Sequence, residues 1–428
     1  MRLFPLAKVR RIAKGAPMSP TLRILFALLA GLVLGAALAA LAPSWRGTAI
    51  SVMGALGGVW LDALRMTIVP LVFALLVTGV AQAAGALQAG GVAARALIAF
   101  IVLLLAAASV AAVATPLVLQ IWPTPTAASA ALRAAAHGAG EMPPVPPLAA
   151  WLSSFVPDNP VKAAADGAMA PLVFFALMFG LAAARIDAVR RERLFGFFDA
   201  AQAAMMVIVE WVLWVAPAGV FALALVFGAR TGVEGLGVLA HYVSVVSLMC
   251  LSAGVIGLLV GLVGGRLAPG RLLSALIPVS AVAISTQSSL ACLPTMLEAS
   301  KRLGVSDSVR DLVLPMAVAL FRITSPAGNM AVAIYVAHML GVAVDPARVV
   351  AGIVVAVLVS LAAVGIASSV TFFTTLGPIF MAMGLPMDLL PLLLAVETLP
   401  DLSRTLGNIA GHVGVTAMLD RATARRAG

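Results

Sequence analysis

The sequence predicts an all-α protein that crosses a membrane many times. Of its 428 residues, 62% are hydrophobic and only 10% are charged, and the mean hydropathy is +1.11. A typical soluble domain carries about 25% charged residues and about 45–50% apolar ones. A chain of this composition has too little polar surface to face water on all sides, so most of its surface must face lipid. The same composition excludes disordered and fibrous proteins. A disulfide-stapled fold is excluded because the two cysteines lie in separate apolar segments.

The first apolar run, residues 24–42, follows a basic N-terminus and is long enough for a membrane-spanning helix. It is too long for the apolar region of a usual signal peptide, and no small-residue cleavage site stands out after it. We therefore expect a first transmembrane helix with a cytoplasmic N-terminus. Seven further spans are expected at 52–81, 95–121, 171–184, 203–228, 242–264, 312–340 and 389–419.

Two more apolar stretches, residues 272–299 and 349–385, are interrupted by polar residues. The first interruption is 285–289 (STQSS). The second begins at 368–371 (SSVT) and continues to Gly377-Pro378. Non-helical backbone at membrane depth is tolerated only where protein buries it or where it lines a wet cavity. We interpret both stretches as re-entrant helical hairpins, and the repeated pairing of hairpin and helix is typical of the inverted repeats of transporters.

Membrane topology explains most of the net charge of +10. Lysines and arginines cluster in 185–193, 266–271, 301–310 and 421–426, and such clusters mark cytoplasmic loops and ends. Eight crossings then place both termini in the cytoplasm, and no nucleic acid is needed to explain the basic excess. The Ala- and Pro-rich stretch 123–150 is expected to form an external loop.

Polar side chains lie along one face of the last span. They are Asp401, Arg404, Thr405, Asn408 and His412. Successive members are three or four residues apart, except for the adjacent pair at 404 and 405, and this spacing places them on one face of a helix. Ionisable residues inside a span are expensive and mark functional sites by default. The alternative is a structural ion pair between Asp401 and Arg404 on a buried helix. Packing alone does not readily explain a carboxylate, a guanidinium, an amide and an imidazole in one stripe.

The stripe fits a zwitterionic acid as substrate. The guanidinium of Arg404 can bind a carboxylate through two hydrogen bonds, Asp401 can hold an ammonium group, and Asn408 can donate to a second carboxylate. Backbone N–H groups at hairpin tips bind anions, and Ser288 and Ser289 lie at the first expected tip. The predicted substrate site comprises Ser288, Ser289, Asp401, Arg404, Thr405 and Asn408.

The span 312–340 carries a second polar group. Pro326 and Gly328 are expected to break this helix and free carbonyls near Asn329, where a cation or substrate can bind. Arg322 lies about ten residues inside the apolar run, where reaching the membrane interface is awkward. The alternative is a simple proline kink with Arg322 extended to the interface. Because the chain shows no metal-ligand spacing, activated nucleophile or phosphate loop, we expect neither a cofactor nor an enzyme.

Several motifs occur in order along nearly the whole chain: LRMTIVPLVF at 64–73, VPDNP at 156–160 with 174–180, APAGVF at 216–221, SSLACLP at 288–294, Asn329-Met330, and the last stripe from Asp401 to Gly411. Together they resemble the dicarboxylate/amino acid:cation symporter family, the glutamate transporter homologues. The resemblance implies a single transporter domain over 1–428 with the elevator fold of that family, built from eight transmembrane helices and two re-entrant hairpins, and a homotrimer. It also implies that the tip of the second hairpin lies at 370–373.

The resemblance also implies a division of labour. A scaffold part is expected at about 20–90 and 150–230, and a transport part at about 91–122 and 240–425. In the family pattern, Asp401 would hold the substrate's amino group and Arg404 its side-chain carboxylate, with Thr405, Asn408 and the hairpin serines beside them.

Positions that bind sodium in the family differ in this chain. His412 stands in place of a carboxylate, and Ala331 and Ala333 stand in place of the Asp and Thr of the Asn-Met-Asp-Gly-Thr motif. A sodium ion needs oxygen ligands, so sodium coupling is not expected. An unperturbed histidine titrates near pH ~6.5, so His412 can carry a proton or a fixed charge, and Arg322 can replace a lost cation. The predicted coupling residues are Asn329, His412 and Arg322.

We therefore predict a secondary active transporter of the bacterial inner membrane that moves an acidic amino acid or a C4-dicarboxylate, either proton-coupled or uncoupled. Its expected partners are a small anionic substrate, a coupling cation and the lipid bilayer. A transporter of a neutral amino acid or other small solute is one alternative. If Asp401 is locked to Arg404, a plain dicarboxylate or a neutral solute is favoured as substrate. A non-transporting channel or sensor with the same fold is the other.

Overall fold

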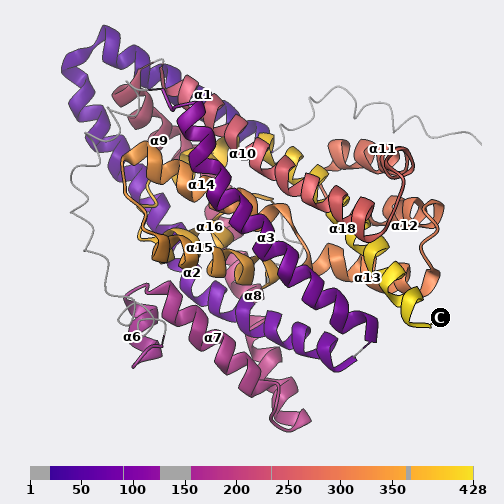
Figure 1. Cartoon of the computed structure of the whole chain (residues 1–428). Helices are drawn as coiled ribbons and strands as arrows, with labels where there is room; N and C mark the ends of the chain where they lie inside the picture. Colours follow the sequence, from indigo (N-terminus) through magenta and orange to yellow (C-terminus); the bar gives the residue numbers. More distant parts are fainter. Residues whose placement is uncertain (1–19, 90, 126–155, 233, 363–367, 428) are drawn as a thin grey trace, which may run out of the picture.

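The computed structural model describes residues 20–89, 91–125, 156–232, 234–362 and 368–427, which are helical apart from short connections and contain no strand (Figure 1). Seven helices in these ranges are long and apolar enough to cross a membrane. The prediction of an all-α membrane protein is thereby confirmed. The expected loop at 123–150 lies outside the described residues, except for its first three positions.

One group of helices comes from the N-terminal half of the chain. It consists of α1 (Pro20–Leu41), α2 (Pro43–Ala89), α6 (Pro160–Ala165), α7 (Met169–Ala183), α8 (Ala188–Trp214) and α9 (Ala216–Thr231). Helix α1 packs along α9, while α2 contacts α7, α8 and α9. Gly35 lets the first pair approach closely, since a Cβ there would lie 2.2 Å from the carbonyl oxygen of Leu225.

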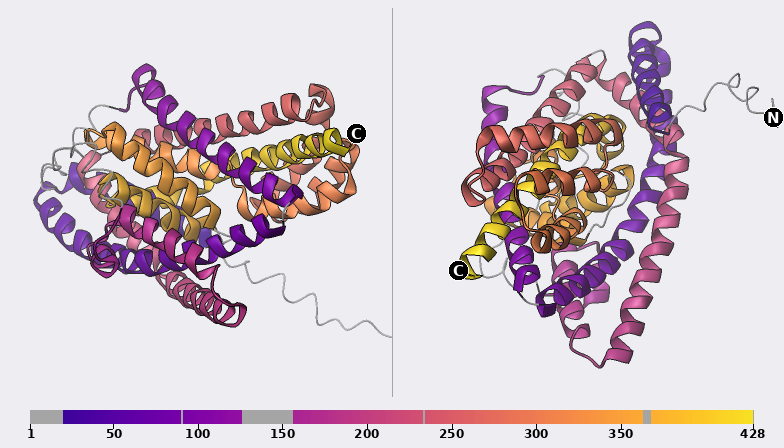
Figure 2. Two further views of the ribbon diagram at one scale, coloured as in Figure 1. Left: turned by 60° about the horizontal axis from the view of Figure 1, so that its bottom comes forward. Right: turned by 90° about the vertical axis from the view of Figure 1, so that its right-hand side faces the viewer.

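The second group surrounds the C-terminal helix. It consists of α3 (Gly91–Ile121), α10 (Glu234–Leu259), α11 (Pro269–Thr286), α12 (Leu293–Arg302), α13 (Asp307–Leu320), α14 (Thr324–Leu340), α15 (Pro346–Ala362), α16 (Ser368–Met383), α17 (Leu390–Val396) and α18 (Thr398–Ala427). Figure 2 shows α2 and α8 running along one side of this orange and yellow cluster.

Helices α10 and α18 meet backbone to backbone. A Cβ on Gly257 would lie 2.6 Å from the Cα of Gly411, and one on Gly254 would lie 2.8 Å from the Cα of Gly407. Small residues at such crossings are how membrane helices pack tightly. This contact holds the polar stripe of α18 at a fixed distance from α10.

Two hairpins of helices lie in the second group. Helices α11 and α12 contact each other across a turn in which Gln287 adopts a left-handed conformation (φ 50°), so the first predicted helical hairpin is present. Helices α15 and α16 also contact each other, and the turn between them, 363–367, lies outside the described residues. The tip expected at 370–373 is wrong, because these residues belong to α16. Pro378 does not end that helix, since a membrane helix tolerates a proline when neighbours satisfy the freed carbonyl.

Three prolines decide where long apolar stretches divide. The span expected at 203–228 is wrong: it is two helices, and α9 begins at Ala216, one residue before Pro217. The expected last span divides at Glu397, three residues before Pro400. The helix break expected near Asn329 is also wrong, because Pro326 is the third residue of α14 and the chain is non-helical at 321–323 instead. A proline fits the first turn of a helix but clashes with the carbonyl four residues earlier, so each break precedes its proline.

Candidate functional site

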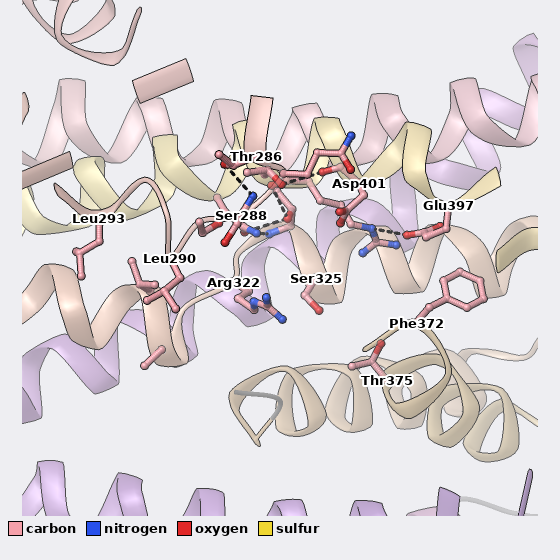
Figure 3. Close-up of a pocket in the computed structure, with 18 of the residues that line it drawn as sticks. Thr286, Ser288, Leu290, Leu293, Arg322, Ser325, Phe372, Thr375, Glu397 and Asp401 are labelled. Carbon is pink, nitrogen blue, oxygen red and sulfur yellow. Dashed lines mark hydrogen bonds and ion pairs between the residues drawn. The ribbon is translucent and has the colours of Figure 1, made fainter. Parts of the chain in front are cut away.

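A pocket of about 520 Å³ lies between the tip of the first hairpin, the junction of α13 and α14, helix α16 and the start of α18 (Figure 3). Every residue of the predicted substrate site lines it: Ser288, Ser289, Asp401, Arg404, Thr405 and Asn408. Arg322 and Asn329 line it too, whereas His412 does not. Residues more than 100 positions apart in the sequence are thus brought to one cavity.

The helical repeat of α18 presents its polar groups to this pocket. The Asp401 N–H donates to the Glu397 carbonyl (2.9 Å) and the Thr405 hydroxyl to the Asp401 carbonyl (3.0 Å), so these side chains lie one turn apart on the same face. Glu397 therefore extends the stripe by one turn toward α17. Glu397 is not among the predicted site residues, because the predicted stripe begins at Asp401, although the same four-residue spacing includes Glu397.

Arg404 is held by two partners. Its Nε lies 2.8 Å from Oε1 of Glu397, and its Nη1 donates to Oδ1 of Asn329 (3.2 Å). The Tyr242 hydroxyl from α10 donates to the other oxygen of Glu397 (3.4 Å). The two charged side chains are only 11% and 6% exposed. Because a buried charge needs a paired partner, this arrangement lets both side chains stay charged in the core.

Arg322 differs from Arg404 in its surroundings. It lies in the non-helical junction between α13 and α14, and its side chain lines the pocket. Within the described part of the chain, no hydrogen bond or ion pair reaches its guanidinium group, and Figure 3 draws no interaction to it. The pocket thus holds one guanidinium that is engaged by protein groups and one that is not.

Asn408 connects the stripe to the same junction. Its Oδ1 accepts hydrogen bonds from the N–H (3.1 Å) and the hydroxyl (2.9 Å) of Thr324, the first residue of α14. This is the role of a helix cap supplied from another helix, because it satisfies a free N–H at the start of α14. The side-chain nitrogen of Asn408 is left as the group that can donate into the pocket.

His412 lies one turn below Asn408 and is completely buried. Its Nε2 is 2.7 Å from the carbonyl oxygen of Phe321, in the junction that also carries Arg322. A carbonyl oxygen only accepts, so this contact assigns the proton to Nε2. The helix break at 321–323 therefore leaves the Phe321 carbonyl without a helical partner, and the N–H of His412 donates a hydrogen bond to it.

The sequence is similar to those of known membrane transporters. A model of the sodium:dicarboxylate symporter family matches residues 21–422. The proton/glutamate-aspartate symporter of Escherichia coli (strain K12) is 27% identical over 410 residues, covering 91% of this chain and 90% of the relative. The human neutral amino acid transporter B(0) is 31% identical over 395 residues (83% and 71%). The proton/sodium-glutamate symport protein of Bacillus caldotenax is 27% identical over 263 residues (60% and 61%).

Proposed function

Because the chain belongs to the sodium:dicarboxylate symporter family, we propose that it is a cation-coupled secondary transporter whose substrate is an acidic amino acid or a C4-dicarboxylate. One observation carries this proposal: Asp401 and Arg404 line the same pocket, opposite the serine-rich tip of the first hairpin. A carboxylate there suits an ammonium group, and a guanidinium suits a carboxylate. The Escherichia coli and Bacillus caldotenax relatives are named as symporters of glutamate or aspartate, which agrees with this substrate class.

A neutral amino acid is the second candidate, and a different observation favours it. The charge of Arg404 is already compensated by Glu397 at 2.8 Å, which reduces the need for an anionic side chain on the substrate. The human relative is named for neutral amino acids. The two candidate substrates therefore differ in whether they require an uncompensated positive charge in the pocket.

We propose a proton as the coupling ion. Ala331 and Ala333, which replace the oxygen ligands of the family motif, are buried in α14 and provide no side-chain oxygen. His412 adds an N–H donor at the Phe321 carbonyl, where a cation would need an acceptor. Arg322 and Asn329, the other predicted coupling residues, line the substrate pocket.

The two helix groups support an elevator-like division of the chain. Helices α1, α2, α7, α8 and α9 contact one another and correspond to the proposed scaffold. The hairpins and α18 belong to the other group, which would carry the pocket across the bilayer. A trimer of such protomers, in the inner membrane of a bacterium with both chain ends in the cytoplasm, completes the proposal.

Uptake into proteoliposomes tests this function. Labelled aspartate, succinate and serine would be offered under separate proton, sodium and potential gradients. We expect aspartate uptake that an inward proton gradient accelerates and a sodium gradient does not. Sodium-driven uptake that ignores pH would contradict the proposed coupling. The absence of counterflow for every substrate would favour a channel or sensor.

A further inference from the structure

We propose that three arginines, Arg266, Arg421 and Arg425, form a binding site for the phosphate headgroup of an anionic phospholipid. The site lies where α10 and α18 end (the end of α18 is marked C in Figure 1), and none of its residues lines the substrate pocket. The site depends on neither the substrate nor the coupling ion proposed above. With both chain ends in the cytoplasm, the lipid belongs to the cytoplasmic leaflet.

Close packing brings the three arginines together. The chain beyond α10 approaches α18 so closely that a Cβ on Gly265 would lie 3.0 Å from the Cβ of Ala417. Arg266 directly follows that glycine. Arg421 lies about one helical turn beyond Ala417, and Arg425 lies about one turn further along α18. Two segments far apart in the sequence therefore place their guanidinium groups at one end of the molecule.

The protein does not compensate the repulsion within this cluster. Arg421 lies beyond the expected end of the last span, and desolvation together with the charges of Arg266 and Arg425 lowers the pKa of its guanidinium group. In the part of the chain that the structure describes, no hydrogen bond or ion pair reaches these three side chains, and the Nε of Arg421 is buried without a partner. The adjacent carboxylate of Asp420 accepts from the N–H (3.2 Å) and the hydroxyl of Ser306 instead. Because an unsatisfied buried donor costs free energy, an anion that accepts from Arg421 would stabilise this end of the molecule.

Arginines in other basic segments have acidic partners. Arg190 pairs with Asp187 at 3.3 Å, and Arg302 pairs with Glu298 at 3.2 Å. The excess of lysine and arginine at cytoplasmic ends explains the sign of the charge at the end of α18. It does not explain why three arginines from two segments gather there without a carboxylate, which a bound anion would explain.

The backbone that positions Arg266 is unusual. Helix α10 continues into a π-helical turn, η2 (Val260–Gly264), and Arg266 then adopts a left-handed conformation (φ 52°). This conformation is costly for a residue other than glycine, and both π-turns and such strained residues are frequent at functional sites. Core packing does not require an arginine here, because the Arg266 side chain is exposed. A binding role accounts for an arginine at this position.

An exposed apolar face of α10 leads to the arginines and favours a lipid over a free anion. Leu251, Val255, Leu259 and Val263 are spaced four residues apart and are 45%, 51%, 50% and 74% exposed. They belong to a segment that is long and apolar enough to cross a membrane, so an acyl chain can lie along them while its headgroup reaches Arg266. Guanidinium groups bind phosphate oxygens through two parallel hydrogen bonds, and basic pockets at the cytoplasmic side of transmembrane helices bind lipid headgroups.

Native mass spectrometry of the purified full-length protein, titrated with phosphatidylglycerol, tests the site. We expect each of Arg266→Gln, Arg421→Gln and Arg425→Gln to weaken phosphatidylglycerol binding by about 5-fold, and the double variant of Arg266 and Arg421 to weaken it further. Binding of zwitterionic phosphatidylcholine should not change. Arg421→Lys should fall between Arg421→Gln and wild type, since it keeps the charge and loses the two-pronged geometry.

Arg193→Gln is the matched control. It removes one exposed arginine from a different basic segment, in α8, and should leave phosphatidylglycerol affinity unchanged. An equal loss in this control would mean that overall charge attracts the lipid, and it would overturn the proposed site. Unchanged affinity in the double variant would overturn it as well.

Thermal melts in phosphatidylcholine alone separate binding from a structural role. Because Arg421→Gln removes a repulsive charge, it should melt at least as high as wild type while it loses the stabilisation by phosphatidylglycerol. A lower melting temperature without that loss would make Arg421 a structural residue. If inorganic phosphate stabilised wild type as much as phosphatidylglycerol does, the site would belong to a free anion and the lipid assignment would fail. If Arg421→Gln does not fold, Arg425→Gln decides, since its side chain is exposed.

Discussion

Nε of Arg404 lies 2.8 Å from Oε1 of Glu397, and both side chains are buried at the wall of the pocket. The carboxylate also accepts from Tyr242, and the guanidinium also donates to Asn329. This network joins α18 to α10 and α14. It means that Arg404, a candidate substrate-binding cation, is already paired with an internal anion, while its Nη2 has no hydrogen-bond partner among the described residues.

Replacing Glu397 should release Arg404 for an anionic substrate. In Glu397→Gln, breaking a buried pair leaves an uncompensated guanidinium, so the empty protein should be less stable by about 3 kcal/mol or more. We expect aspartate to restore more thermal stability to this variant than to wild type. Thermal melts with and without aspartate provide the measurement. Glu298→Gln, which removes an exposed pair with Arg302, is the control and should not change the response.

Lowering the pH should affect the wild-type protein in the same way as the substitution Glu397→Gln. A proton on Glu397 would weaken its hold on Arg404, with Asp401, Tyr242 and Arg322 as the other ionisable groups at this site. Aspartate binding should therefore tighten as the pH falls, and the dependence should flatten in Glu397→Gln. Binding measured from pH 8 to pH 5.5 tests this. An equally steep dependence in both proteins would assign the proton to another group.

His412→Gln should separate coupling from binding. A glutamine can still donate to the Phe321 carbonyl, which His412 now contacts at 2.7 Å, but it cannot titrate. We expect aspartate exchange between equal concentrations to persist and the acceleration by a proton gradient to fall, with only the part that depends on Glu397 remaining. Proteoliposome exchange and gradient-driven uptake are the two readouts. Gradient-driven uptake at the wild-type rate would show that His412 is not the coupling group.

Asn408 should show two separable roles. Its Oδ1 caps α14 through Thr324, so Asn408→Ala should cost about 0.5–2 kcal/mol of stability. Asn408→Asp keeps the acceptor oxygen and should retain the cap, while losing the donor that faces a substrate carboxylate. Melting temperature and aspartate affinity measured on both variants distinguish the roles. Equal stability of the two would argue against the cap.

The glycine contact between α10 and α18 predicts a packing defect. A Cβ on Gly257 would lie 2.6 Å from Gly411 backbone, and forced contacts in a packed interior cost about 1–3 kcal/mol. Gly257→Ala should therefore lower the melting temperature. Gly58→Ala in α2 has nothing within 4 Å of its new Cβ and is the matched control. If both variants melt together, the close approach is not a constraint.

The predicted substrate residues could be chosen from the sequence because their signal is local. A stripe at three- and four-residue spacing on an apolar helix needs no tertiary information, and all six predicted substrate residues line one pocket. Glu397 was equally visible at that spacing, while Tyr242 was not, since nothing in its own apolar segment points to a carboxylate on another helix. The helix break was predicted near Asn329, but it lies at 321–323, before Pro326. The sequence shows that a proline interrupts the helix, but it does not show on which side of the proline the interruption lies.

Composition and helical periodicity alone determined that the chain is an all-α membrane protein with a polar stripe on its last helix. Those properties follow from transfer of apolar surface out of water and from the 3.6-residue repeat, which act along the chain. Only the tertiary structure decided which charges are paired. Arg404 and Arg322 look alike in the sequence, and the fold brings Glu397 and Asn329 to the first but leaves the second facing the pocket. Pairing depends on distances of a few ångströms between different segments, and these are set by how the helices pack.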